Sequence, residues 1–159
     1  MIESRLPGAL RELATRLDSA GLNWAVGGSL SLALRGAPIQ PRDIDIVTDM
    51  AGSYEIERIF SRFVTKRVSL RTSENIRSHF GVLDLDGVKI DIMGDFQLLG
   101  ADGEWGEPPN LRSMIETVRV EDLQIPVPSL EWEHMAYSRL GRQDKVDIID
   151  RLLKDKRIR

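Results

Sequence analysis

Residues 27–46 read GGSLSLALRGAPIQPRDIDI, and the expected fold is built outward from this stretch. A short strand over residues 23–26 runs into the glycine pair, and a helix over residues 29–35 follows. Glycines at a strand-to-helix turn let the backbone approach a ligand closely, and the first turn of the helix offers free N–H groups that suit a phosphate. Gly27-Gly28-Ser29 is therefore a candidate phosphate-binding turn, although a glycine pair is equally typical of an ordinary tight turn.

The second half of the stretch contains two aspartates one residue apart. We expect a strand over residues 42–48, in which Asp43 and Asp45 point to one face and Ile44 and Ile46 to the other. Two carboxylates on one face repel each other unless a cation lies between them, and a divalent metal ion is the simplest candidate. A half-exposed strand with charged residues on its outer face explains the same pattern equally well.

A predicted β-hairpin that turns at Asp86-Gly87 supplies a third candidate carboxylate. This dipeptide, flanked by two runs of alternating apolar residues, is a strong signal for a two-residue turn. In that register Asp84 opposes Lys89, which explains both charges as an ordinary cross-strand pair. Asp91 instead lies opposite Val82 and faces away from the apolar side of the hairpin. Its charge has no cross-strand partner, which favours a functional interpretation.

The two segments are connected by their faces. If the isoleucines of both segments share one apolar face, then Asp43, Asp45 and Asp91 share the other. Three converging carboxylates form a hard-cation site of the type that magnesium prefers. Two such ions could clamp the attacking and leaving oxygens of a phosphoryl-transfer reaction.

Length and composition exclude several other classes of protein. The chain has 159 residues, which is enough for one domain with a real core. Its net charge of -3 offers no global basic field that would attract nucleic acid. There is no cysteine, and two histidines far apart in sequence make a zinc site a poor hypothesis. No apolar run approaches the length of a membrane span, so we expect a cytoplasmic protein.

The remaining segments predict elements that pack around this site. We expect helices at about residues 4–19, 53–63 (with Ser53 as its N-cap) and 129–140, a last helix that ends near residue 156, a strand at 66–70, a second hairpin at 117–127, and loops at 71–78 and 94–112. Arg71 and Arg77 in the first loop could meet an anionic substrate, although solvated surface is the more common role for such residues.

Taken together, these motifs resemble the nucleotidyltransferase superfamily that includes DNA polymerase beta. Its pattern is Gly-Gly or Gly-Ser, a helix, a strand with Asp-x-Asp, and a third acidic residue on a later strand, and the order here matches. Over nearly its full length the chain is similar to a little-characterised group of minimal stand-alone bacterial and archaeal members. Many of these have a Lys-Asp pair after a Gly-Arg, whereas Gly141-Arg142 is followed here by Gln143-Asp144-Lys145. We therefore assign no role to that helix.

The resemblance implies a fold of the α/β (α+β) class. We expect a nucleotidyltransferase-type twisted mixed β-sheet flanked by helices, with C-terminal helices and a catalytic face open to solvent. It implies one nucleotidyltransferase domain over residues 1–159, with a core at about 1–128 and a C-terminal helical segment at about 129–159.

The resemblance also implies a reaction, the transfer of a nucleoside monophosphate from an NTP such as ATP to an acceptor hydroxyl with release of pyrophosphate. Asp43 and Asp45 would hold two Mg²⁺ ions, and Asp91 would hold the ion on the acceptor side and help deprotonate the hydroxyl. The triphosphate would be bound by Gly27, Gly28 and Ser29. The acceptor could be a small molecule, a protein side chain or RNA.

Two other interpretations stay open at this point. The protein could be a non-catalytic or antitoxin-like binding module that uses the fold to bind a partner or a nucleotide. It could also be a purely structural domain whose aspartates lie on its surface. A chain that kept only the fold would have no need of the three acidic positions, so the enzyme is favoured.

Overall fold

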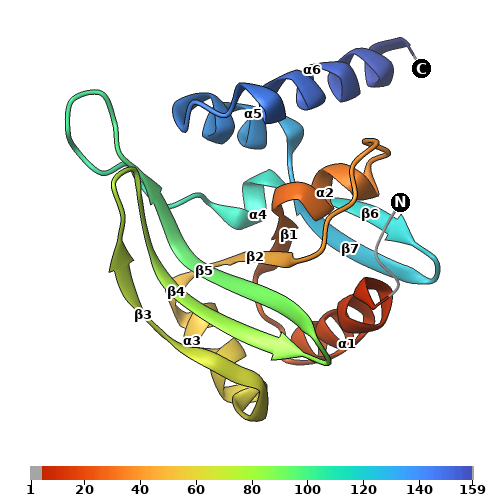
Figure 1. The fold of residues 1–159 in the computed structure, drawn as a ribbon, viewed down its shortest axis with the longest axis vertical. Coiled ribbons are helices and arrows are strands. Elements are labelled where there is room, and N and C mark those ends of the chain that lie inside the picture. Colours follow the sequence, from red (N-terminus) through yellow and green to blue (C-terminus); the bar gives the residue numbers. More distant parts are fainter. Residues whose placement is uncertain (1–4, 159) are drawn as a thin grey trace.

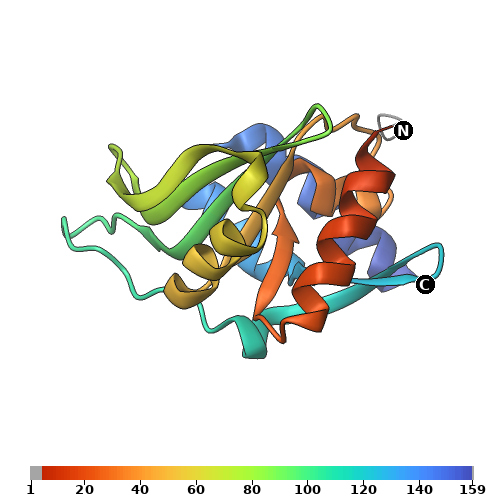
Figure 2. The same cartoon turned by 90° about the horizontal axis from the view of Figure 1, so that it is seen from below.

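The structure is a computed structural model, and it describes residues 5–158. A five-stranded mixed sheet forms its centre, with helices on both faces (Figures 1 and 2). The strand order is β1-β2-β5-β4-β3, in which β2 and β5 are parallel and the other neighbours are antiparallel. The strands are β1 (Trp24–Gly27), β2 (Ile44–Thr48), β3 (Val64–Thr72), β4 (Ile76–Leu85) and β5 (Val88–Leu98). This is the expected mixed α/β class.

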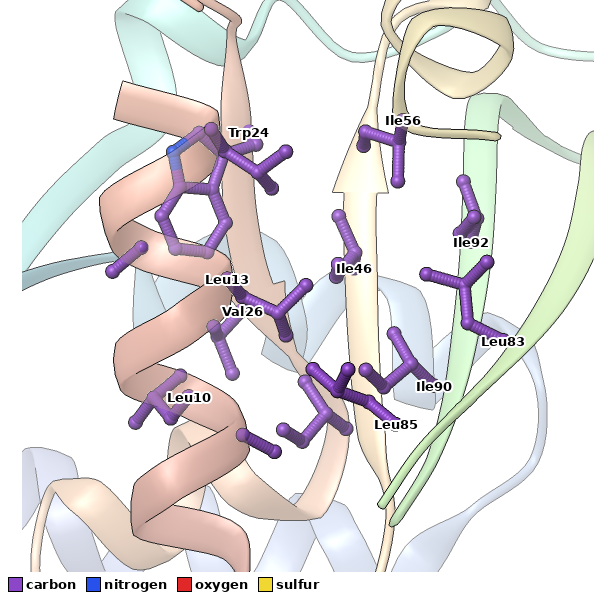
Figure 3. Close-up of a cluster of buried hydrophobic side chains, with 14 of the residues drawn as sticks. Leu10, Leu13, Trp24, Val26, Ile46, Ile56, Leu83, Leu85, Ile90 and Ile92 are labelled. Carbon is purple, nitrogen blue, oxygen red and sulfur yellow. The ribbon is translucent and has the colours of Figure 1, made fainter. Parts of the chain in front are cut away.

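One face of the sheet is covered by α1 (Leu6–Ser19) and α3 (Met50–Ile59), the latter followed by the short 3-10 helix η1 (Ser61–Phe63). Pro7 lies in the first turn of α1, where the missing N–H costs nothing. The predicted start of this helix at residue 4 lies outside the described residues. Figure 3 shows how side chains from α1, α3 and the sheet meet in one apolar core.

The other face is partly covered by the C-terminal helices α5 (Leu130–Arg139) and α6 (Gln143–Ile158), which lie above the sheet in Figure 1. Leu32 of α2 (Gly28–Leu34) packs with Leu130 of α5 and Ile149 of α6 in a second apolar cluster. A short helix, α4 (Leu111–Met114), precedes the second hairpin, β6 (Ile115–Val120) and β7 (Leu123–Pro128). This hairpin is confirmed.

The faces of the central strands are as the residue pattern predicts. Ile44 lies beside Ile90 and Ile46 beside Ile92 in the parallel β2–β5 pair. All four side chains are fully buried, and Figure 3 shows Ile46, Ile90 and Ile92 pointing into the core. The hairpin register is confirmed as well, because β4 pairs with β5 so that Asp91 lies opposite Val82. Asp45 and Asp91 lie between these isoleucines in their strands, so they face the opposite side of the sheet, toward α5.

Two predicted loops are corrected by the structure. β3 extends to Thr72 and β4 begins at Ile76, so only residues 73–75 of the predicted loop at 71–78 lie between strands. β5 continues beyond Met93 to Leu98, so the predicted loop at 94–112 begins later. Polar and small residues obscured both strand ends in the sequence, and tertiary pairing overrides such weak local preferences.

The long β5 strand contains a bulge that changes which face its residues occupy. The register with β4 shifts between the pairs His79–Gly94 and Arg77–Gln97, and Asp95 has a positive φ of 50°. The extra residue reverses the alternation, so Phe96 joins an apolar cluster with Ala136 of α5. The bulge thus lets α5 pack on the end of the sheet beside the aspartates.

Two helix and strand ends differ from prediction. The N-cap of α3 is Asp49, whose carboxylate accepts the Gly52 N–H at 2.7 Å, and not Ser53, which is buried in the second turn. β2 begins at Ile44, so Asp43 lies in the bend just before the strand. In the described part of the chain, no helix is both long and apolar enough to cross a membrane.

Candidate active site

Asp45 and Asp91 lie side by side on the two parallel central strands. Their Cα atoms are direct register partners in the β2–β5 pair, and both side chains are partly buried. Asp43 is exposed in the bend before β2, and its negative charge acts on both of the other carboxylates. The structure thus brings the three predicted acidic residues into one neighbourhood, with two of them in the sheet and one at its rim.

Gly28 is in direct contact with the Asp45 carboxylate. This glycine has a φ of +64°, and a Cβ atom added to it would lie 2.1 Å from Asp45 Oδ2. Gly27, its neighbour, is the register partner of Asp45 in the β1–β2 pair. Only a residue without a side chain can make this close approach, which explains the glycine at this turn.

Ser29, the third residue of the turn, contacts a residue that the sequence analysis left without a role. Lys145 of α6 donates a hydrogen bond from Nζ to Ser29 Oγ at 2.6 Å. Lys145 also lowers the pKa of Asp45, against the larger effects that raise it. The order Gln143-Asp144-Lys145 departs from the expected Lys-Asp pair, and the sequence does not show which side of α6 faces the glycine turn. The contact of Lys145 with Ser29 was therefore not predicted.

Asp91 has an unsatisfied oxygen. Its Oδ1 atom is buried and accepts no hydrogen bond from any residue that the structure describes. The ammonium of Lys89 is 3.6 Å away, close enough for an ion pair and too far for a hydrogen bond. A buried carboxylate oxygen without a donor is costly, and it points to a ligand that completes its coordination.

Burial and neighbouring negative charge raise the pKa values of both strand carboxyls. Burial is the largest cause of the rise for Asp45, whose pKa reaches about 6, and the charges of Asp91 and Asp43 add to it. Burial also raises the pKa of Asp91, while Lys89 opposes that rise. The folded chain therefore contains a concentration of negative charge that is incompletely balanced by its own cations.

Glu133 of α5 is a second site residue that the sequence analysis missed. It is 2% exposed, and its Oε2 atom accepts a hydrogen bond from Ser31 Oγ at 2.7 Å and forms an ion pair with Arg35 at 3.4 Å. The backbone N–H of Gly28 also lowers the pKa of this carboxyl. Burial raises the pKa of Glu133 to about 7 despite these donors. α5 is therefore tied to the glycine turn through one buried carboxyl.

The acidic residues are not a preassembled metal cage. In residues 5–158, no three His, Cys, Asp or Glu side chains gather closely enough to hold a metal ion as they stand. The ligand chemistry nevertheless fits a hard cation, because the partly buried groups are carboxylates. One of them, Asp91, has an oxygen that accepts no hydrogen bond from the described residues. Asp45 and Asp91 are the residues best placed to hold one.

An open pocket of about 150 Å³ lies between the sheet and α5, and we call it the α5 pocket. Gly28 and Asp45 form one side, while Phe96, Trp132 and Tyr137 contribute aromatic rings. The predicted open catalytic face is therefore partly roofed by α5. A substrate bound at Asp45 has an apolar cavity immediately beside it.

The sequence model of the aminoglycoside-2″-adenylyltransferase family matches residues 9–152. The chain belongs to this family. Its members are nucleotidyltransferases by name, and the resemblance seen in the sequence is thereby confirmed. No curated protein matches the chain.

Solved structures agree with this assignment. A candidate nucleotidyltransferase from Thermotoga maritima is 45% identical with a TM-score of 0.85, and the match covers 98% of this chain and 96% of that one. The lincosamide antibiotic adenylyltransferase LnuA, solved with lincomycin bound, shares the fold at 13% identity with a TM-score of 0.58, over 95% of this chain and 98% of that one. The fold is also shared, at 13% identity and a TM-score of 0.62, with ANT(2″)-Ia in complex with adenylyl-2″-tobramycin, over 95% of this chain and 91% of that one.

Replacing Gly28 with alanine tests the contact with Asp45. Gly28→Ala and Gly21→Ala both place a side chain at positive φ, but the Gly21 Cβ meets nothing within 4 Å. Each change should lower the free energy of unfolding by about 1 kcal/mol because of the backbone conformation. Gly28→Ala should lower it by roughly 1–3 kcal/mol more, because its Cβ overpacks against Asp45. Urea unfolding measures both values. In an Asp45→Ala background that excess should disappear. Equal costs for the two glycines would contradict the contact.

The raised pKa of Asp45 predicts a pH-dependent effect of Asp45→Asn. The pKa rises from 3.8 to about 6 on folding, so this carboxyl favours the folded state below about pH 4 and loses that contribution as the pH rises through 6. The neutral asparagine should therefore stabilise the protein above pH 6, by up to about 3 kcal/mol, and make little difference at pH 4. Unfolding of both proteins in EDTA at pH 4 and pH 8 measures this. A loss of stability of Asp45→Asn at pH 8 would contradict the raised pKa of Asp45.

Proposed function

We propose that this protein transfers a nucleoside monophosphate from an NTP to an acceptor hydroxyl in a magnesium-dependent reaction. The observation that supports this best is the pairing of Asp45 and Asp91 on adjacent strands, with a buried Asp91 oxygen that has no hydrogen-bond donor among the described residues. ATP is the first nucleotide to test, because the family is named for adenylyl transfer.

In the proposed reaction the acceptor oxygen attacks the α-phosphorus of the NTP. A bond forms between these two atoms, the bond from the α-phosphorus to the oxygen that bridges to the β-phosphorus breaks, and pyrophosphate leaves. The hydroxyl proton passes to Asp91 and then to solvent. The pKa of Asp91 is raised by burial, which makes this carboxylate a better proton acceptor near neutral pH.

The acidic residues would hold the metal. Asp43 and Asp45 would hold two Mg²⁺ ions, with Asp91 as a further ligand on the acceptor side. When bound, the ions would offset the negative charge that builds up on the phosphate oxygens. Asp45 is kept in position by its contact with Gly28 and by the buried isoleucines on either side of it in β2.

The glycine turn would bind the triphosphate. Gly27, Gly28 and Ser29 allow the phosphates to approach the backbone closely, and α2 begins at this point. Lys145 adds a positive charge beside Ser29. Glu133 and Arg35 anchor the same turn to α5, so the phosphate site is built on rigid elements.

A labelling experiment tests the proposed activity. The full chain is incubated with Mg²⁺, fractionated cell extract and ATP labelled at either the α- or the γ-phosphate. We expect label from the α position, and none from the γ position, on an acceptor. Asp45→Asn and Asp91→Asn should lower the rate at least about a hundredfold, because each removes charge that holds the cations.

The matched control is Asp84→Asn. Asp84 is an exposed aspartate on β4 that accepts the Gly87 N–H at 2.8 Å, so it undergoes the same charge change outside the proposed site. The control should keep full activity. Transfer that is equally fast in all three variants would contradict the assigned roles, and a chain that binds neither nucleotide nor Mg²⁺ would contradict the function.

A further inference from the structure

A second pocket adjoins the site on the face of the sheet that bears the aspartates. It has a volume of about 280 Å³, it lies on β3, β4 and β5, and we call it the strand pocket. Phe80 and Met93 contribute its apolar side, and Arg71 lies at its β3 end. Met93 and Ile76 also line the α5 pocket, so the two pockets are neighbours.

Strand register places the strand pocket on the same face as Asp91. Asp91 pairs with Val82, Met93 with Phe80, and Arg71 with Ser78. Alternate residues of β4 share a face, so positions 78, 80 and 82 form one row that leads from Asp91 to Arg71. The four residue-to-residue steps from position 82 to position 78 span roughly 13 Å along the strand.

The charges along this row are positive, apart from the aspartates already discussed. Lys89 is 3.6 Å from Asp91 Oδ1, and Lys66 lies 5.9 Å from the centre of the Phe80 ring. Within residues 5–158, the exposed Arg71 guanidinium has neither an ion-pair nor a hydrogen-bond partner. Among the described residues, none of those that line the strand pocket has a carboxylate. Asp84 lies beyond Asp91 at the hairpin turn, where its carboxylate accepts the Gly87 N–H.

Arg77, on the neighbouring strand β4, is already engaged. Arg77 donates a hydrogen bond from Nε to Gln97 Oε1 at 3.0 Å, and its guanidinium lies 4.9 Å from the centre of the Trp105 ring. Arg77 therefore helps to hold the loop that follows β5. Arg71 is the arginine that remains available to a ligand in the strand pocket.

We propose that the acceptor is a small anionic hydroxyl compound with an apolar body. This inference rests on the proposed function, and it assigns the strand pocket as the acceptor site. The acceptor hydroxyl lies at Asp91, the apolar body packs on Phe80 and Met93, and a carboxylate or phosphate pairs with Arg71. An arginine fork is well suited to either anion.

The same charges disfavour a polycationic acceptor. Aminoglycosides contain several amino groups that are protonated near neutral pH, and these would meet Lys66, Lys89 and Arg71 along the row. Like charges at such short range oppose binding, and selection against a ligand often uses this kind of repulsion. The family's name, which refers to aminoglycosides, therefore does not identify the acceptor of this chain.

Three phenols that share a 4-hydroxyphenylalkyl body and carry head groups of different charge test the inference. They are 3-(4-hydroxyphenyl)propionate, its neutral methyl ester and the cationic tyramine, and (4-hydroxybenzyl)phosphonate distinguishes a phosphate-type from a carboxylate-type anion. Binding to the full chain is measured by calorimetry with Mg²⁺, and tobramycin is included as a polycation. The anionic phenols should bind at least about tenfold more tightly than tyramine, as expected for one charge-assisted hydrogen-bonded pair.

Two arginine variants identify the site of this preference. Arg71→Gln should weaken binding of the anionic phenols about tenfold and leave the methyl ester unchanged. Arg62→Gln, an equal charge change at an exposed position of η1 after α3, should have no effect. The proposal is overturned if no anionic phenol binds, if tyramine or tobramycin binds as tightly, or if the two variants behave alike.

The outcomes separate this inference from the proposed function. If binding shows no preference for anions while α-labelled ATP still modifies an acceptor in an Asp45-dependent manner, only the acceptor class is wrong. If the anionic phenols bind through Arg71 and no label is transferred in any extract fraction, the proposed function fails and the strand pocket remains an anion site.

Discussion

The structure depends on keeping two carboxylates side by side in the middle of a sheet. Asp45 and Asp91 are register partners. Burial raises both pKa values, and the charge of Asp91 adds to the rise for Asp45. The apolar core on the opposite face holds this arrangement, because a slip of one residue in either strand would turn buried isoleucines to solvent. Hydrophobic burial of those side chains offsets the electrostatic cost of the two carboxylates, so a charged site can persist on a stable sheet.

The segments around the site are explained by the same constraint. Gly28 is needed because the Asp45 carboxylate occupies the space of a side chain, and Glu133 fixes that turn from α5. Lys145 reaches the turn from α6, which gives the C-terminal helices a place in the site and not merely in the core. The bulge at Asp95 allows α5 to sit on the sheet next to the aspartates. The glycine turn near the start of the chain is therefore held in place by side chains of the C-terminal helices.

The family resemblance implied the fold class, and local patterns were enough to predict the faces of the central strands. The Asp86-Gly87 turn set the hairpin register, and alternation then placed Asp91 on the face opposite the isoleucines. The contributions of Glu133 and Lys145 could not be predicted, since each depends on a contact between segments distant in sequence. Arg71, by contrast, was already a candidate for contact with an anionic substrate. The end of β5 was missed for a related reason, because the bulge at Asp95 breaks the alternation that identifies a strand.

The most direct test of this account is whether Asp45 and Asp91 together bind a divalent cation. Crystals of the full chain grown with Mn²⁺ and a non-hydrolysable ATP analogue would locate the metal by its anomalous scattering. We expect at least one peak in contact with carboxylate oxygens of both aspartates, at roughly the 2.0–2.3 Å typical of a hard divalent ion, and no such peak in Asp45→Asn crystals. A nucleotide-bound structure with no metal at these two residues, or with the metal held elsewhere, would contradict the account.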